Sequence, residues 1–196
     1  MYDEITEIED YAISRNGNLI ALRMSSALEN AWYGSFSSNI RLLSIVFPDA
    51  FEQAGTSLVQ GCQSLETVNL GSVLDIPYAA ATSCYNLDRI ITSELIETIG
   101  YSAFALTQLK NIHIQETVTS IGAAAFSNVK PETVTIDSEA VANALDSINS
   151  CGSLIQNAYV VKLKNGLTIN RALWGYFNYH GLTDGYHIFI SKTKDV

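Results

Sequence analysis

The chain has few of the residues that nucleic-acid binding or membrane insertion requires. Its 196 residues include 11 Lys and Arg against 20 Asp and Glu, which gives a net charge of −9 at pH 7. Nucleic acids and anionic membranes both need a basic protein surface, so neither is expected as a partner. No apolar run approaches the roughly 18 residues of a transmembrane helix, so we expect no membrane insertion.

Cysteine is also scarce. The three cysteines, Cys62, Cys84 and Cys151, are too few and odd in number for a disulfide framework. Neither a second cysteine pair nor a nearby histidine completes a zinc ligand set around Cys62 and Cys84. We therefore expect buried structural thiols, no metal and no other cofactor.

The beginning of the chain lacks the basic residues of a secretory signal peptide. Five of the first ten residues are acidic. A chain with this start that works outside a cell is expected to be a mature fragment or to be released by lysis.

The sequence is instead rich in one repeated pattern. Ile99-Gly100 and Ala103-Phe104 recur 22 residues later as Ile121-Gly122 and Ala125-Phe126. A triad of the form apolar-x-x-apolar-x-apolar occurs six times, with steps of 23, 23, 22, 22 and 22 residues. The triads are Leu19/Leu22/Met24, Leu42/Ile45/Phe47, Leu65/Val68/Leu70, Leu87/Ile90/Thr92, Leu109/Ile112/Ile114 and Pro131/Val134/Ile136.

A fixed period in the twenties is typical of a leucine-rich-repeat solenoid. The last two apolar residues of each triad alternate as in a strand, so both point inward and the residue between them points outward. We therefore predict an α/β-type solenoid over residues 1–137, a right-handed leucine-rich-repeat coil with a short parallel β-sheet and about six repeats. The segments 51–61 and 73–82 keep the repeat length but lose the Gly-x-x-Ala-Phe motif, so they are either irregular or altered for a purpose.

The register changes after Asp137, and we treat residues 138–196 as a C-terminal cap or attachment segment. Asp137-Ser138 predicts the start of a short helix that includes Ile148 and ends at 149–152. Strands are expected at 159–163, as a seventh rung before an Asn165-Gly166 turn, and at 187–191. The aromatic side chains of this segment either cover the end of the core or form an assembly surface. The residues expected in such a surface are Trp174, Tyr176, Phe177 and Tyr179.

The outward residues of the triads form columns along one face, which is the usual binding surface of a solenoid. Small polar residues mixed with a few apolar ones suit a protein or a glycan, although a plain solvated face has the same composition. The ligand-binding candidates on this face are Arg23, Asn69, Arg89, Ile91, Asn111 and His113.

Other reactive residue types give weaker patterns. Glu94, Glu97 and Glu116 could face one another across repeats as paired carboxylates, but solvated turns also explain them. His180, Asp184 and His187 have a helical spacing, which glycines 181 and 185 oppose, so a metal site is not expected. No nucleophile triad, phosphate loop or zinc motif occurs, and we do not expect an enzyme.

The repeats resemble the BspA-like leucine-rich repeats, also called the Treponema pallidum type, over about residues 5–137. The resemblance rests on the two copies of the motif from Ile99 and Ile121, on the strand exits Phe47-Pro48 and Leu70-Gly71, and on Cys62 and Cys84, three residues before a triad. It implies a curved solenoid, common on bacterial or protozoan surfaces and in phage virion proteins, that works in adhesion or recognition without catalytic residues. Thr92 and Pro131 depart from the aliphatic residues of the pattern.

Three functions remain open at this stage. The first is a non-enzymatic adhesion or recognition module on a virion or cell exterior, with a protein or glycan as its partner. The second is an assembly subunit or homo-oligomer, since residues 1–158 carry 18 acidic and 6 basic side chains (−12) and residues 159–196 carry 2 and 5 (+3). The third is a hydrolase with carboxylates on the sheet face.

Overall fold

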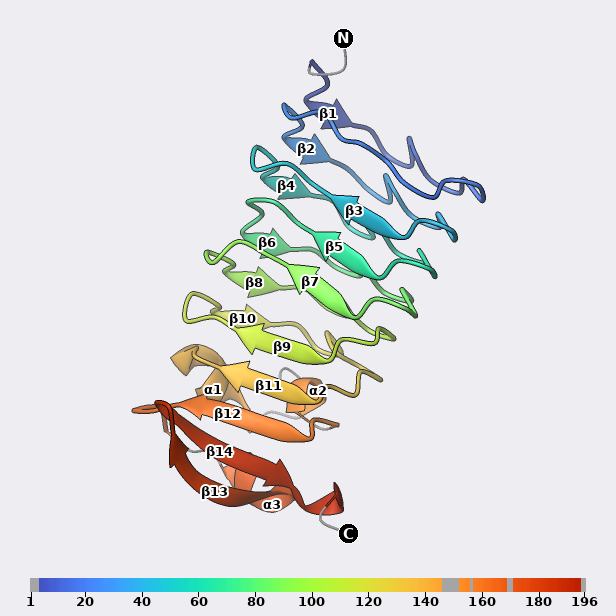
Figure 1. Cartoon of the computed structure of the whole chain (residues 1–196). Helices are drawn as coiled ribbons and strands as arrows, with labels where there is room; N and C mark the ends of the chain where they lie inside the picture. Colours follow the sequence, from blue (N-terminus) through green and yellow to red (C-terminus); the bar gives the residue numbers. More distant parts are fainter. Residues whose placement is uncertain (1–3, 146–151, 156, 169–170, 195–196) are drawn as a thin grey trace.

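A computed structural model describes residues 4–145, 152–155, 157–168 and 171–194. The chain winds as a solenoid with two columns of short parallel strands (Figure 1). The front column consists of β3 (Ser44–Val46), β5 (Thr67–Asn69), β7 (Arg89–Ile91), β9 (Asn111–Ile114), β11 (Thr133–Ile136) and β12 (Val160–Lys164). The back column consists of β1 (Glu7–Ile8), β2 (Asn30–Ala31), β4 (Gln53–Ala54), β6 (Asp75–Ile76), β8 (Thr98–Ile99) and β10 (Ser120–Ile121).

The predicted strand register is confirmed from the second triad onward. Val68 pairs with Ile90 across β5 and β7, and Ile112 pairs with Val134 across β9 and β11. Val68 and Val134 are fully buried, and the residues beside them face outward as the alternation requires. A continuous apolar core therefore runs along the coil between the two columns.

The front column is interrupted once. Strands β3, β5 and β7 form one parallel sheet, and β9, β11 and β12 belong to another, with no strand pairing between β7 and β9. The back column stays paired beside this interruption, because β8 bonds to both β6 and β10. The break between β7 and β9 therefore lies on the front face, and the back column has its own gap in pairing between β4 and β6.

The first triad is a correction to the sequence prediction. The described residues 19–24 form no strand, and Leu19, Leu22 and Met24 are only partly buried. The backbone of this segment contacts the next coil through a bond from Leu43 N to Ile20 O, 3.1 Å long, which does not make a ladder. Arg23 therefore lies on an exposed irregular segment.

The return segments settle the question left open for 51–61 and 73–82. Every return segment has two left-handed residues at equivalent positions, and these two segments are as regular as the others. The left-handed pairs are Tyr11 and Arg15, Gly34 and Ser38, Ser57 and Gly61, Ala79 and Ser83, Ser102 and Leu106, and Ala124 and Asn128. The backbone of the motif is thus kept where its residues are not.

Glycine is needed where successive coils touch. A Cβ atom on Gly122 would lie 2.4 Å from Tyr101 N, and one on Gly100 would lie 2.6 Å from the carbonyl carbon of Pro77. Both contacts are to backbone, which cannot rotate away. The repeated Ile-Gly therefore sets the close approach of neighbouring coils.

The C-terminal segment continues the front sheet. Ser138 caps α1 (Glu139–Ala144) by accepting from Val141 N, and β12 pairs in parallel with β11, which confirms the predicted N-cap and seventh rung. The predicted end of this helix, with Ile148, Cys151 and 149–150, lies outside the described residues. The remaining elements are α2 (Gly152–Ile155), α3 (Arg171–Tyr176), β13 (Phe177–Thr183), β14 (Tyr186–Ser191) and a 3-10 helix (Lys192–Lys194). Strands β14 and β13 extend the sheet antiparallel beyond β12.

Candidate functional site: a cleft in the front sheet

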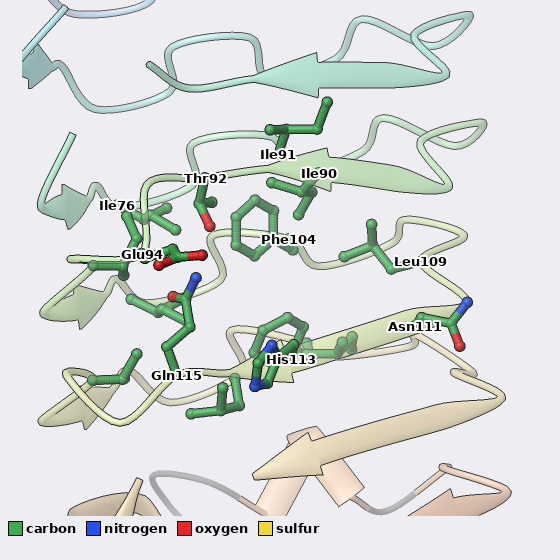
Figure 2. Close-up of a pocket in the computed structure, with 16 residues that line it drawn as sticks. Ile76, Ile90, Ile91, Thr92, Glu94, Phe104, Leu109, Asn111, His113 and Gln115 are labelled. Carbon is green, nitrogen blue, oxygen red and sulfur yellow. The ribbon is translucent and has the colours of Figure 1, made fainter. Parts of the chain in front are cut away.

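A cleft of about 350 Å³ opens where β7 and β9 are not paired. Its floor is apolar and includes Ile90, Phe104 and Ile112, with the ring of Phe104 lying between the two strands (Figure 2). Phe104 stacks on Phe126, the equivalent residue of the next coil, with ring centroids 5.7 Å apart. The cleft thus separates the two front strands above the buried core residues Phe104 and Ile112.

The position of the cleft coincides with one departure in the repeat. The last triad residue is buried as Phe47, Leu70, Ile114 and Ile136, but the equivalent Thr92 is only half-buried and lines the cleft. A threonine fills less apolar volume than these residues, and the neighbouring coils do not close the space. Ile90 is also half-buried, unlike the inward residues of the other front strands.

Polar groups gather at one end of the cleft. Glu94, Gln115 and Thr92 line it, and Figure 2 shows the carboxylate of Glu94 and the amide of Gln115 close to each other there. Gln115 Nε2 donates to the carbonyl oxygen of Ser93 at 3.1 Å, which links the exits of β9 and β7. Within the described part of the chain, the carboxylate of Glu94 has no hydrogen bond or ion pair.

His113 joins the cleft to a charged group on the next coils. Its Nε2 lies 2.9 Å from Asp137 Oδ2, and Lys164 Nζ lies 2.8 Å from Glu116 Oε2. The hydrogen bond and charge of Glu116 raise the pKa of Lys164, although both side chains are exposed to solvent. Burial of Tyr186, at the start of β14, raises the pKa of its hydroxyl group, and the hydrogen bond and charge of Asp137 raise this pKa further.

The structure brings together some of the ligand-binding candidates. Ile91, Asn111 and His113 line the cleft, and Arg89 lies on β7 beside it. Asn69 lies one strand away on β5, and Arg23 lies on the irregular first coil, so neither belongs to the cleft. The sequence flagged Thr92 only as a departure, and it gave no signal that Glu94 and Gln115 would lie at the mouth.

The cysteine prediction is confirmed for the two described thiols. Cys62 and Cys84 are free and fully buried, and they donate to Phe36 O and Val59 O at 3.2 Å. Burial raises the pKa of Cys62 to about 11 and raises that of Cys84 further. Asn39 holds the same position one coil earlier and donates to the carbonyl oxygen of Phe36 at 2.8 Å. The side chains at this position of the repeat therefore bind backbone carbonyl groups in the turns of the solenoid.

The carboxylate candidates do not form a pair. Glu94 and Glu116 hold equivalent positions in successive coils, but Glu94 faces the cleft whereas Glu116 binds Lys164. Glu97 is exposed beside β8 in the back column.

The C-terminal histidines lie on a hairpin, with His180 on β13 and His187 on β14. His187 Nδ1 lies 3.0 Å from the hydroxyl of Tyr179, and Asp184 occupies the turn between the strands with a φ of 51°. Over the residues that the structure describes, no three His, Cys, Asp or Glu side chains come together as metal ligands.

The aromatic side chains of the tail divide into two groups. Trp174, Tyr176 and Tyr179 are exposed by 48%, 69% and 40%, as an assembly surface requires. Phe177 is a correction, because its ring is 2% exposed and packs in the core with Phe189. It therefore belongs to the cover of the core and not to an exposed surface.

Comparison with protein families agrees with this geometry. The model of the BspA-type leucine-rich repeat region matches residues 1–88 and 74–167, with six copies. The chain belongs to this family. The match reaches beyond residue 137 and includes β12, the rung that pairs in register with β11. Leucine-rich-repeat domains are generally non-enzymatic modules that mediate protein interactions.

The fold is shared with a solved bacterial protein. A leucine-rich repeat protein from Eubacterium ventriosum aligns over 65% of this chain and 41% of its own, with 22% identity and a TM-score of 0.55. The chain thus spans about two fifths of the length of that protein. A leucine-rich repeat protein from Bacteroides ovatus aligns over 86% of this chain and 61% of its own, with 15% identity and a TM-score of 0.43.

Two further comparisons gave negative results. No curated protein matches the chain. Of the helices within the described residues, none has the length and apolar character needed to cross a membrane.

Proposed function

We propose that the chain is a non-enzymatic protein-binding module and that the front face from β3 to β12 is its binding surface. The observation that carries the proposal is the cleft, where the front sheet is split and the half-buried Ile90 lines the opening. The aliphatic side chain of Ile91, which is 44% exposed, lines the cleft. An exposed apolar side chain beside an apolar cleft is typical of a site that a partner covers.

A peptide-display selection tests this proposal. Peptides selected on the wild-type protein are measured against Ile91→Glu on the front face and Leu74→Glu beside the back column, two aliphatic residues of similar exposure. We expect Ile91→Glu to weaken binding by tenfold or more and Leu74→Glu to have little effect, because a charge in the centre of an apolar interface is not solvated. Peptides that bind Ile91→Glu but no longer bind Leu74→Glu would place the binding surface on the back face and contradict the proposal.

The finer role that we propose is recognition or adhesion on a bacterial or virion surface, with a surface protein as the partner. A surface glycan is the alternative ligand, because the front face also carries small polar residues such as Asn69 and Asn111. A glycan array separates the two: binding that is lost with Asn111→Ala but kept with Ile91→Glu would favour a sugar.

A second function, assembly through the C-terminal hairpin, is favoured by a separate observation. Among the strands of the described residues, β13 is an edge strand that pairs with β14, and Trp174, Tyr176 and Leu182 are exposed near it. An open edge of this length is a template for pairing with a second copy. We expect Tyr176→Glu to dissociate such an oligomer, measured by its mass in solution, whereas Tyr85→Glu, another exposed tyrosine, leaves the mass unchanged. A monomeric wild-type protein would reject assembly.

A further inference from the structure

We propose that the cleft between β7 and β9 binds an apolar side chain of a partner protein that has a Lys or Arg as its neighbour. This inference rests on the proposed protein-binding function and names the chemistry that the cleft selects. Three features of the cleft support it: the apolar floor, the set of hydrogen-bond acceptors at its mouth, and the charge around it.

The floor selects an apolar group. Ile90, Phe104 and Ile112 face a space of about 350 Å³ at the split in the sheet. This volume lies at the small end of the usual range of ligand pockets, roughly 300–1,000 Å³, so it suits a single anchor such as Leu, Met or Phe. Apolar walls with no atoms opposite them lose dispersion contacts, and an inserted side chain restores these contacts.

The mouth selects a hydrogen-bond donor with positive charge. The carboxylate of Glu94 can only accept, and the amide of Gln115 has used a donor on Ser93 O, which leaves its oxygen as an acceptor. The hydroxyl of Thr92 lies at the same end of the cleft (Figure 2). A lysine ammonium or an arginine guanidinium supplies several donors and no acceptor, which matches this set.

The surrounding charge also favours a cation. The nearest equivalent acid, Glu116, is neutralised by Lys164 at 2.8 Å, so Glu94 is the carboxylate that remains available at the mouth. The neighbouring front segments carry two basic residues, Arg89 and Lys110. Lys110 lies 3.8 Å from Asp88, so an acidic side chain offsets part of this positive charge. The net charge of −12 over residues 1–158 attracts a basic partner over a longer distance.

Short capped peptides test this chemistry directly. The probe is Ac-Gly-Leu-Lys-Gly-NH2, and the matched controls replace its Lys with Glu or its Leu with Ala. Binding is followed at pH 7.5 by NMR of the isoleucine methyl groups of the full chain. We expect Leu-Lys to shift Ile90, Ile99 and Ile112, which line the cleft, and to leave Ile45 on β3 unchanged. Each control peptide should bind about tenfold more weakly, the ratio expected for one lost charge-assisted hydrogen bond or one lost apolar anchor.

Two variants separate the floor from the mouth. Thr92→Leu places in the cleft an apolar residue of the kind that the other coils carry and should abolish binding of the probe. Glu94→Gln changes an exposed side chain, so it should fold normally and should weaken binding of Leu-Lys about tenfold, as one lost charge-assisted hydrogen bond does. Glu66→Gln, an exposed carboxylate before β5, is the matched control and should leave binding unchanged.

The outcomes also distinguish this inference from the proposed function. If Leu-Lys and Leu-Glu bind equally, if Glu94→Gln binds as the wild type does, or if no cleft methyl shifts, the cleft inference is overturned. Display-selected peptides that lose binding to Ile91→Glu but bind Thr92→Leu and Glu94→Gln normally would reject the cleft and keep the front face. Peptides indifferent to all three variants would reject both.

Discussion

The spacing of the coils makes a sharp prediction at Gly122. An alanine Cβ there would lie 2.4 Å from Tyr101 N, 2.7 Å from the carbonyl carbon of Gly100 and 2.8 Å from Tyr101 Cα. All three atoms belong to the backbone of the preceding coil, so the clash is relieved only if the two coils separate. Overpacking of a core typically costs about 1–3 kcal/mol, and we expect Gly122→Ala near the upper end of that range.

The assay is thermal and urea unfolding of Gly122→Ala beside Gly17→Ala. A loss of about 2–3 kcal/mol lowers the Tm of a chain of this size by roughly 4–12 °C. Gly17 is exposed and has nothing within 4 Å of an added Cβ, so Gly17→Ala should be neutral or slightly stabilising. Equal effects of the two substitutions, or a Gly122→Ala protein as stable as the wild type, would refute the proposed contact between coils.

Three further predictions concern stability. Ile112→Ala should lower the free energy of unfolding by about 2–5 kcal/mol, because Ile112 is 6% exposed. His113 is exposed, so His113→Ala should change the free energy of unfolding by less than about 1 kcal/mol. Equal losses in urea unfolding would contradict the register of β9. Ser38→Gly should raise the Tm, because Ser38 is exposed with a φ of 59°, and Ser44→Gly on β3 should lower it; a fall in both would mean that the left-handed backbone carries no strain. Burial raises the pKa of Cys62 to about 11. The stability gained from its neutral thiol is therefore complete below the unfolded thiol pKa of about 8.5 and is lost as the pH rises toward 11. The free energy of unfolding should fall less over this range in Cys62→Ala than in the wild type, and an identical fall would contradict the buried thiol.

The strand register could be predicted because it depends on local alternation. In a strand, residues two apart share a face, so the pairs Ile45 and Phe47 or Ile112 and Ile114 identify the inward side without knowledge of the partner strand. The prediction failed at Leu22 and Met24, where a ladder needs several bonds to the next coil and the structure shows one at Leu43.

The return segments show that the backbone conformation of the repeat is kept even where the sequence motif is missing. The equivalent left-handed positions hold Gly61 in one coil and Ser83 in the next, since several residues adopt this conformation at moderate cost. Loss of the Gly-x-x-Ala-Phe motif therefore did not mean loss of the turn.

The cleft could be predicted only in part. Thr92 was visible as a departure, but a smaller residue does not by itself determine whether neighbouring coils close around it. That outcome depends on whether the backbones of β7 and β9 bond to each other, which involves both coils together. The placement of Glu94 and Gln115 at the mouth follows from the same split and has no local signature.

The most direct test of the binding surface is the NMR footprint of a display-selected peptide on the isoleucine methyl groups of the wild-type chain. Ile90, Ile91 and Ile112 lie at the front face and its cleft, whereas Ile8 and Ile121 lie in the back column. The account predicts that the largest shifts fall on the first three. Shifts confined to Ile8 and Ile121, with the front-face methyl groups unchanged, would contradict it.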